Sequence, residues 1–311
     1  MLINAAANQT NIINNRHDLT AKTLLSYPGS TTTNVAACAN CTTFPNVATY
    51  ANNSLEQALD NIFYHPNVGP YVGKFMIQHL VTSDPTPAYI SRVAAAFNDN
   101  GSGVRGDMRA VIRAVLLDPE ARGDAKTDPN FGKLREPTLY ATNLFRSFGV
   151  KGVSTPQSDG YMYARGQFSG MAQVPFLSPT VFNFYPPDYG IPGTTLLGPE
   201  FAILTTGTAI GRANFVYTMF FTPPFVAVSS PNSPLGTTID IADLQALSTA
   251  DSTGNLLIEE LNSRMLHNTM TETNKTTVRN AVTAYAASDP LNRARQAVYL
   301  IGTSSQFQVQ R

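Results

Sequence analysis

The chain has 311 residues, and its 21 lysines and arginines balance 21 aspartates and glutamates, so the formal net charge is zero. Hydrophobic residues make up 43% of the chain, which is enough for one large core or two smaller ones. The balanced charge argues against a general nucleic-acid or anionic-membrane binder, because both need a surplus of basic side chains.

The N-terminal part of the sequence is polar. Residues 1–15 are rich in asparagine and lack a basic stretch followed by an apolar one, so no signal peptide is predicted here. Residues 26–54 are rich in Ser, Thr, Asn and Pro and show no apolar periodicity. We expect a long loop over these residues.

Three consecutive amphipathic helices are predicted next. Apolar residues recur at helical spacing over 68–80, 90–97 and 108–116. Asp107 is a suitable N-cap for the third of these helices. A shorter apolar face, made by Leu55, Leu59, Ile62 and Phe63, precedes them.

The second half of the chain is also helical, with long irregular connections. A helix over 138–148 ends at Gly149, and residues 150–200 are irregular and rich in Gly, Pro and aromatic residues. Residues 201–221 are the most apolar stretch, but Arg212 near its centre favours a buried core helix over a membrane span. After a proline-rich connector, helices are predicted over 239–247, 256–267, 271–287 and 290–301, the last N-capped by Asp289.

These patterns predict a mainly α fold: a multi-helix orthogonal array with long Pro-, Gly- and aromatic-rich loops and little or no β structure. We divide it into a loop-rich entry segment, 1–54, a main helical region, 55–221, and a C-terminal helical region, 222–311. The two helical regions are expected to pack as one contiguous domain.

The two cysteines, Cys38 and Cys41, form a single C-x-x-C. Thr42 stands where a c-type haem motif needs histidine, and no second cysteine pair is present for a zinc site. The remaining alternatives are a small disulfide or two inert thiols. We favour the disulfide, which would imply an oxidising compartment.

Four polar residues are candidates for catalysis: His17, Asp18, Lys22 and His65. A His-Asp pair with a further histidine has the ligand types that divalent metals prefer. The alternative is structural, since His65 precedes a helix and can accept backbone N–H groups there as a neutral imidazole. No metal site and no cofactor are predicted, because phosphate-binding, nucleophile-elbow and zinc-hydrolase motifs are missing from the sequence.

Two further segments draw attention. Aromatic residues are dense among prolines within 176–192, and we name Phe182, Phe184, Tyr185 and Tyr189 as candidate binding residues. Residues 98–103 resemble the start of a calcium loop, but Arg109 occupies the position at which an EF-hand needs glutamate. A turn between two helices explains that segment better.

Several motifs together resemble one family, the domain of unknown function 1800. They occur in family order over nearly the whole chain: His17–Leu25, His65–Pro70, Gln78–Ser83, Gly103–Asp107, Leu116–Arg122, Lys133–Pro137, Leu177–Tyr185, Pro199–Phe201 and Phe307–Arg311. The resemblance implies a mostly helical, usually exported bacterial protein. It also implies an alkaline-phosphatase-like partner of the domain of unknown function 1501 family, but no catalytic residues. Family members usually begin with a signal peptide and further helices, so we expect this chain to be the C-terminal portion of a longer protein.

Two functional hypotheses follow. The first is a non-catalytic periplasmic, surface or secreted protein that binds a partner protein or polymer through its aromatic-rich loops. The second is a metal-dependent or acid/base hydrolase that uses His17, Asp18 and His65. Whether the protein is an enzyme stays open at this point, and neither nucleic acid nor a transmembrane span is predicted.

Overall fold

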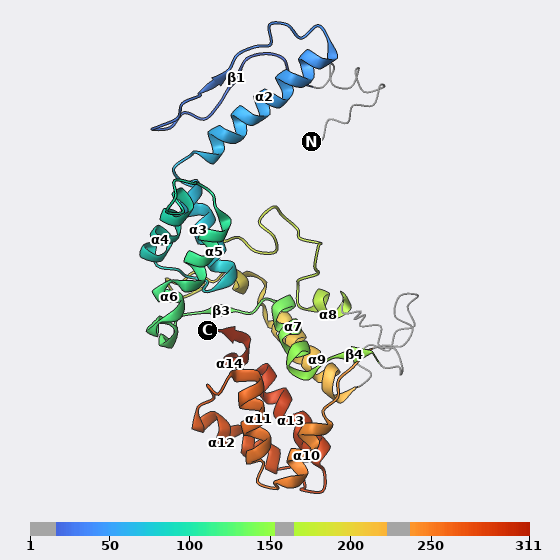
Figure 1. Cartoon of the computed structure of the whole chain (residues 1–311). Helices are drawn as coiled ribbons and strands as arrows, with labels where there is room; N and C mark the ends of the chain where they lie inside the picture. Colours follow the sequence, from blue (N-terminus) through green and yellow to red (C-terminus); the bar gives the residue numbers. More distant parts are fainter. Residues whose placement is uncertain (1–16, 153–164, 223–236) are drawn as a thin grey trace. The chain divides into compact units, whose positions relative to one another are not determined.

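The computed structural model describes residues 17–152, 165–222 and 237–311. They form a mainly α protein, as the helical periodicity predicts, with three short antiparallel strand pairs. The chain divides into two compact units (Figure 1). We call Met1–Met76 with Pro87–Val115 the first unit, and Ile77–Thr86 with Leu116–Arg311 the second.

This division differs from the three regions that the sequence indicated. The loop expected up to residue 54 ends at Thr43, because helix α2 runs continuously over Phe44–Phe63. Residues Ile77–Thr86 and all residues after Val115 belong to the second unit.

The first unit begins with a two-stranded hairpin laid along α2 (Figure 1). Strands β1 (Lys22–Thr23) and β2 (Asn34–Val35) pair with Lys22 opposite Val35. Asn61 of α2 binds the segment between the strands: its amide donates to the carbonyl oxygens of Leu25 and Thr32, both at 2.9 Å.

Helix α2 buries small and polar residues and exposes its large apolar ones. Val47, Ala51 and Ser54 face the interior, whereas Leu55, Leu59 and Ile62 are about half exposed. The first turns of this helix fall within the predicted loop, because the buried face of the helix lacks large apolar residues that would show helical periodicity.

The rest of the first unit is formed by α4 (Pro87–Asn98) and by all but the last residues of α3 (Val68–Leu80) and α5 (Met108–Leu117). All three match predicted elements. The carboxylate of Asp107 accepts from the backbone N–H of Arg109 at 2.9 Å, so the predicted N-cap of α5 is confirmed. A side chain at Gly73 would lie 3.1 Å from Val93, so this glycine allows α3 and α4 to pack closely.

The second unit is built around α13. Its buried residues Ala294, Ala297, Val298 and Ile301 pack among the neighbouring helices. The helices and turns of this unit follow in chain order: α6 (Pro119–Arg122), η1 (Asp124–Thr127), α7 (Pro137–Phe148), α8 (Arg165–Gly170), η2 (Pro199–Ile203), α9 (Thr206–Phe221), α10 (Ala242–Ala250), α11 (Asn255–Leu266), α12 (Glu272–Thr283), α13 (Pro290–Thr303) and α14 (Ser305–Gln308). The predicted caps at Gly149 and Asp289 are both present.

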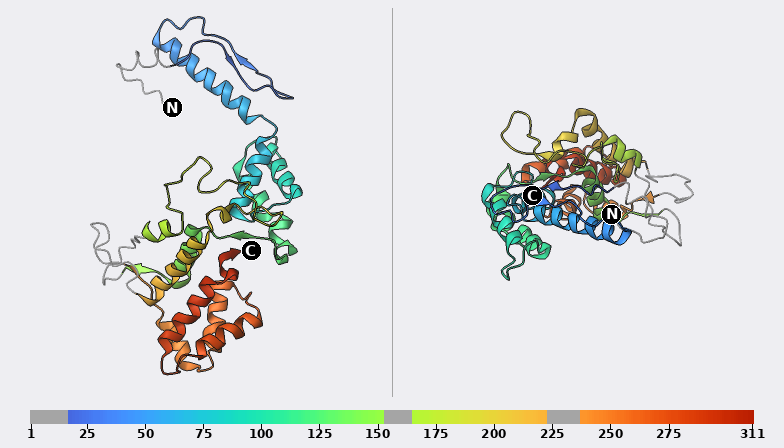
Figure 2. Two further views of the ribbon diagram at one scale, coloured as in Figure 1. Left: turned by 180° about the vertical axis from the view of Figure 1, so that it is seen from behind. Right: turned by 90° about the horizontal axis from the view of Figure 1, so that it is seen from above.

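Two strand pairs tie distant parts of the second unit together. β3 (Lys133–Leu134) pairs with β6 (Val309–Gln310), and β4 (Lys151–Gly152) pairs with β5 (Thr237–Thr238). The views in Figure 2 show the C-terminal segment returning to the strand that precedes α7.

The apolar stretch after residue 200 is a core helix, α9. Arg212 near its middle is buried, and its guanidinium donates to the carbonyl oxygen of Arg135 at 2.9 Å. Among the described residues, no helix combines the length and hydropathy that crossing a membrane requires.

Candidate functional site: an apolar loop on a buried anchor

The loop between α8 and η2 carries the most exposed apolar side chains of the second unit. It leaves the helices as an extended trace, yellow-green in Figure 1. Phe176 is fully exposed, Val181 is 95% exposed, Leu177 57% and Phe182 49%. We call residues 174–184 the apolar loop. Single exposed apolar residues are ordinary on protein surfaces, whereas contiguous exposed apolar patches are typical of interaction sites.

Two tight turns shape the apolar loop. The backbone N–H of Leu177 donates to the carbonyl oxygen of Val174 at 3.1 Å, and that of Asn183 donates to Thr180 at 3.1 Å. The corners of the turns carry Phe176 in the first and Val181 with Phe182 in the second. The turns therefore place apolar side chains where the chain bends away from the protein.

The two ends of the apolar loop meet at Glu136. Gln173 Nε2 donates to Glu136 Oε2 at 2.6 Å, and the hydroxyl of Tyr185 donates to the same oxygen at 2.7 Å. Gln173 Oε1 in turn accepts from the backbone N–H of Thr138 at 2.9 Å. The two ends of the loop, Gln173 and Tyr185, are thus held at one side chain of the neighbouring helix start.

Tyr185 is buried at the base of the loop. Burial, and then the neighbouring carboxylate of Glu136, raise the pKa of the Tyr185 hydroxyl. The phenol therefore stays protonated at neutral pH and acts as a donor. Glu136 stands directly before α7, within the Lys-Leu-Arg-Glu-Pro motif.

A buried ion pair lies in the same unit beside this base. Lys133 Nζ is 3.4 Å from Glu200 Oε1, and both side chains are at most 2% exposed. The ammonium also donates to the carbonyl oxygens of Gln78 and His79, at 3.1 and 2.9 Å, and Ser83 Oγ donates to Glu200 Oε2 at 2.7 Å. Three acceptors satisfy the three donors of the ammonium, which is the condition for a buried charge to be tolerated.

Gln78 links this ion pair to the apolar loop. Its amide donates to the carbonyl oxygen of Ser83 at 3.0 Å and to that of Pro187, just beyond the loop, at 2.8 Å. Glu136, Gln173, Tyr185 and Pro187 thus fix both ends of the loop to α7 and to the buried pair. We call this set of contacts the anchor.

The four predicted binding rings divide between surface and interior. Phe182 is exposed, Phe184 and Tyr189 are half-buried, and Tyr185 points inward to Glu136. Phe176, Leu177 and Val181 were not singled out, although they lie within or beside the stretch identified as rich in rings. The anchor residues lie within or next to the family-like motifs, but their chemistry gave no signal in the sequence because they are far apart along the chain.

The catalytic candidates near the start of the chain make structural contacts. The ring of His17 packs edge-on against Tyr50 with 5.8 Å between centroids, and Lys22 Nζ donates to the Tyr50 hydroxyl at 3.1 Å. The carboxylate of Asp18 accepts from the backbone and side chain of Thr20, and these hydrogen bonds lower the pKa of Asp18. These contacts fix the segment before β1 onto α2.

His65 lies elsewhere in the first unit. Its ring packs against Tyr27, and its Nδ1 accepts the backbone N–H of Asn67 at 3.1 Å, as expected for a cap before a helix. His17 contacts Ser54 of α2, whereas His65 lies just beyond the end of that helix. Nine helical residues separate Ser54 from the helix end, which corresponds to about 14 Å along the helix axis at 1.5 Å per residue.

No metal-binding group is assembled in the part of the chain that the structure describes: no three His, Cys, Asp or Glu side chains gather closely enough. The hydrolase hypothesis stays a prediction, without a site in which its candidates converge. Cys38 and Cys41 are joined by a disulfide in the loop before α2.

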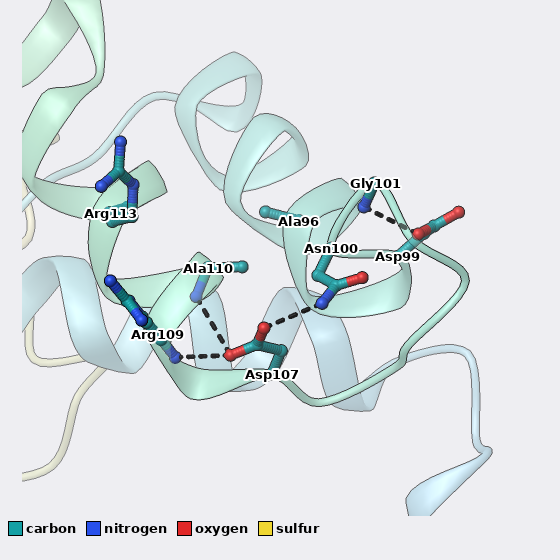
Figure 3. Close-up of a pocket in the computed structure, with 8 residues that line it drawn as sticks. All are labelled: Ala96, Asp99, Asn100, Gly101, Asp107, Arg109, Ala110 and Arg113. Atoms are coloured by element: carbon teal, nitrogen blue, oxygen red, sulfur yellow. Dashed lines mark hydrogen bonds between the residues drawn. The ribbon is translucent and has the colours of Figure 1, made fainter.

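A shallow pocket of about 550 Å³ lies at the turn between α4 and α5 (Figure 3). Asp99 Oδ1 accepts from the backbone N–H of Gly101 at 2.8 Å, and Asn100 Nδ2 donates to Asp107 Oδ2 at 2.8 Å. These oxygens hold the turn together, so the loop that resembles a calcium site is a connection between helices. Arg109 and Arg113 line the other side of the pocket.

The sequence model of one family, described as "Protein of unknown function (DUF1800)", matches residues 3–309. The chain belongs to this family. No curated protein and no solved structure matches it. Members of the DUF1800 family are not defined by a known reaction, so the function has to be argued from the site itself.

Proposed function

We propose that this DUF1800 protein is a non-catalytic, exported protein of the cell envelope or surface that binds a partner protein or polymer through its apolar loop. The observation that carries the proposal is the exposure of Phe176, Leu177, Val181 and Phe182 on a loop whose ends are fixed by the anchor.

The anchor supports a role in binding rather than in catalysis. Its polar side chains are buried and paired with one another, whereas a catalytic group has to reach a substrate. A loop that is already ordered loses little conformational entropy on binding, which favours affinity. The anchor thus serves to present apolar side chains in one arrangement.

Export is supported by the disulfide and by composition. Disulfides persist in oxidising compartments, and the Cys38–Cys41 pair closes a surface loop of the first unit. Only 14% of residues are charged, which fits a polar but uncharged exterior.

The proposed partner is an alkaline-phosphatase-like protein of the domain of unknown function 1501 family. The test is co-purification of the full chain with that protein from the same cells. A matched variant replaces residues 174–184 with a Gly-Ser linker of equal length, and Ile210→Ala, on the exposed face of α9, is the control.

The partner should co-purify with the wild-type chain and with Ile210→Ala, and be lost with the linker variant. Circular dichroism would show that the linker variant keeps its helices. Equal recovery of the partner with the linker variant would overturn the assignment of binding to the apolar loop.

A further inference from the structure

Phe176 occupies a backbone position that suits glycine. It is the third residue of the turn closed by the Leu177–Val174 hydrogen bond, Pro175 is the second, and its φ is +65°. This is the pattern of a type II turn, in which the third position favours Gly or Asn. A bulky residue with positive φ is strained.

The ring of Phe176 makes no packing contact that would compensate for this backbone strain. It is fully exposed, so it packs against no other described side chain of the second unit. Val181, at the corner of the second turn, is almost as exposed. Strained residues that make no stabilising contact are typical of binding and catalytic positions.

The chain segment that carries these two side chains has no charged residue. From Gly166 to Pro187 the sequence has no Asp, Glu, Lys, Arg or His. The polar side chains within the apolar loop are Ser178, Thr180 and Asn183. A partner surface that covered the loop with charged groups would have to bury them unpaired, at a large cost.

Resting on the proposed function, we infer that Phe176 and Val181 are the central contact residues of the interface. Both side chains insert into an uncharged apolar pocket of a partner protein. A large aromatic side chain at the centre of an interface is the usual dominant contributor to affinity. The apolar loop supplies one fully exposed ring and two smaller exposed apolar side chains, Leu177 and Val181.

A protein pocket fits the loop better than a lipid bilayer does. The turn hydrogen bond and the anchor constrain the backbone at Phe176, which has a strained positive φ. A shaped pocket benefits from such a defined geometry and a fluid bilayer does not. Peripheral membrane binding also takes a second signal, such as a cluster of basic residues, and the 22 residues around the tip have none.

The test uses the full chain in its own cells. A photo-reactive benzoyl-phenylalanine is introduced at position 176 or, as a matched exposed control, at position 210. Adducts are identified by mass spectrometry. The expected result is a covalent adduct with one protein at position 176 and none at position 210.

The identified protein is then purified, and its affinity for the chain is measured by calorimetry. Phe176→Gly should weaken binding at least tenfold, and Ile210→Ala should change it less than twofold. Because the interface is uncharged, the dissociation constant should change less than about threefold between 0.05 and 0.5 M salt. Glycine adopts the positive φ of this position without strain, so the Phe176→Gly variant should fold. Weaker binding of this variant would therefore not result from unfolding.

Four outcomes would overturn the inference: no adduct at position 176, an adduct with lipid or with a second copy of the chain, unchanged affinity of Phe176→Gly, or binding to neutral phosphatidylcholine vesicles that Phe176→Gly abolishes. If the linker variant loses the partner and Phe176→Gly keeps it, the proposed function stands and this inference fails. If the linker variant also keeps the partner, the proposed function fails.

Discussion

Gln173 and Tyr185 donate to the same carboxylate oxygen, Oε2 of Glu136, at 2.6 and 2.7 Å. The eleven residues between them form the apolar loop, so one side chain of α7's N-cap closes the whole segment. Hydrogen bonds to an ionised acceptor are stronger than those between neutral groups. The position of Phe176 and Val181 thus depends on a carboxylate that neither of them touches.

Glu136→Ala should loosen the apolar loop and destabilise the second unit. The substitution leaves the buried donors of Gln173 and Tyr185 without their acceptor, which costs about 2–3 kcal/mol of unfolding free energy. Urea denaturation measures the loss, and limited proteolysis should show new cleavage within 174–184. Glu56→Ala, at an exposed position of α2, is the control and should leave both measurements unchanged. A protease pattern identical to that of the wild type would show that Glu136 does not close the loop.

Alkaline pH should destabilise the second unit. Burial raises the pKa of Tyr185 and of Tyr140, whose hydroxyl donates to the carbonyl oxygen of Gly302. A tyrosine with a raised folded-state pKa binds its proton more tightly when folded. Its contribution to stability is therefore complete below the unfolded-state pKa of about 10 and is lost as pH rises above it.

Chemical denaturation between pH 8 and 11 tests this dependence. The unfolding free energy should fall above about pH 10, and Tyr185→Phe should reduce the fall. Absorbance at 295 nm should show these two phenols ionising only as the protein unfolds. A flat stability profile to pH 11 would contradict the expectation.

Phe176→Gly should stabilise the chain. Glycine adopts positive φ without steric cost, and a residue with a side chain loses about 1 kcal/mol or more there. The exposed ring makes no packing contact that the substitution could remove. Thermal unfolding measures the change. Leu177→Gly is the matched control, because Leu177 has no positive φ and gains only backbone freedom, so it should be neutral or destabilising. Equal effects of the two substitutions would argue against strain at Phe176.

The Cys38–Cys41 disulfide should protect both thiols from alkylation. Iodoacetamide should add no mass to the native protein and two adducts after reduction and unfolding. Because the closed loop is short, loss of the bond should lower stability by only about 2 kcal/mol in the chain-entropy description. Cys38→Ser with Cys41→Ser provides the same comparison without reductant. Alkylation of the untreated protein would show that the thiols are free.

The sequence predicted helices better than it predicted sites. The mainly α class, α3, α5 and the caps at Asp107 and Asp289 follow from local spacing and capping chemistry, which act within a few residues. The start of α2 was missed because Val47, Ala51 and Ser54 make a buried face without large apolar side chains. Burial of small residues depends on the hairpin that covers them, and local periodicity carries no information about it.

The candidate site was only partly predictable. An aromatic-rich loop within 176–192 follows from composition, but which rings point outward depends on Glu136, some 40–50 residues earlier in the chain. Contacts of this kind have no local signature. His17 and His65 both lie in motif-rich segments, yet His17 packs against the middle of α2 and His65 lies just beyond the end of that helix.

The pairing of β3 with β6 joins two segments that become available at different times during synthesis of the chain. Lys133 and Leu134 lead directly into Glu136, and their partner strand, Val309–Gln310, is about 175 residues further along. A chain that emerges from its N-terminal end has α7 available long before that strand. The strand before the anchor therefore acquires its partner only when residues 309–310 have been synthesised, and the exposed apolar side chains of the loop stay incompletely positioned until then.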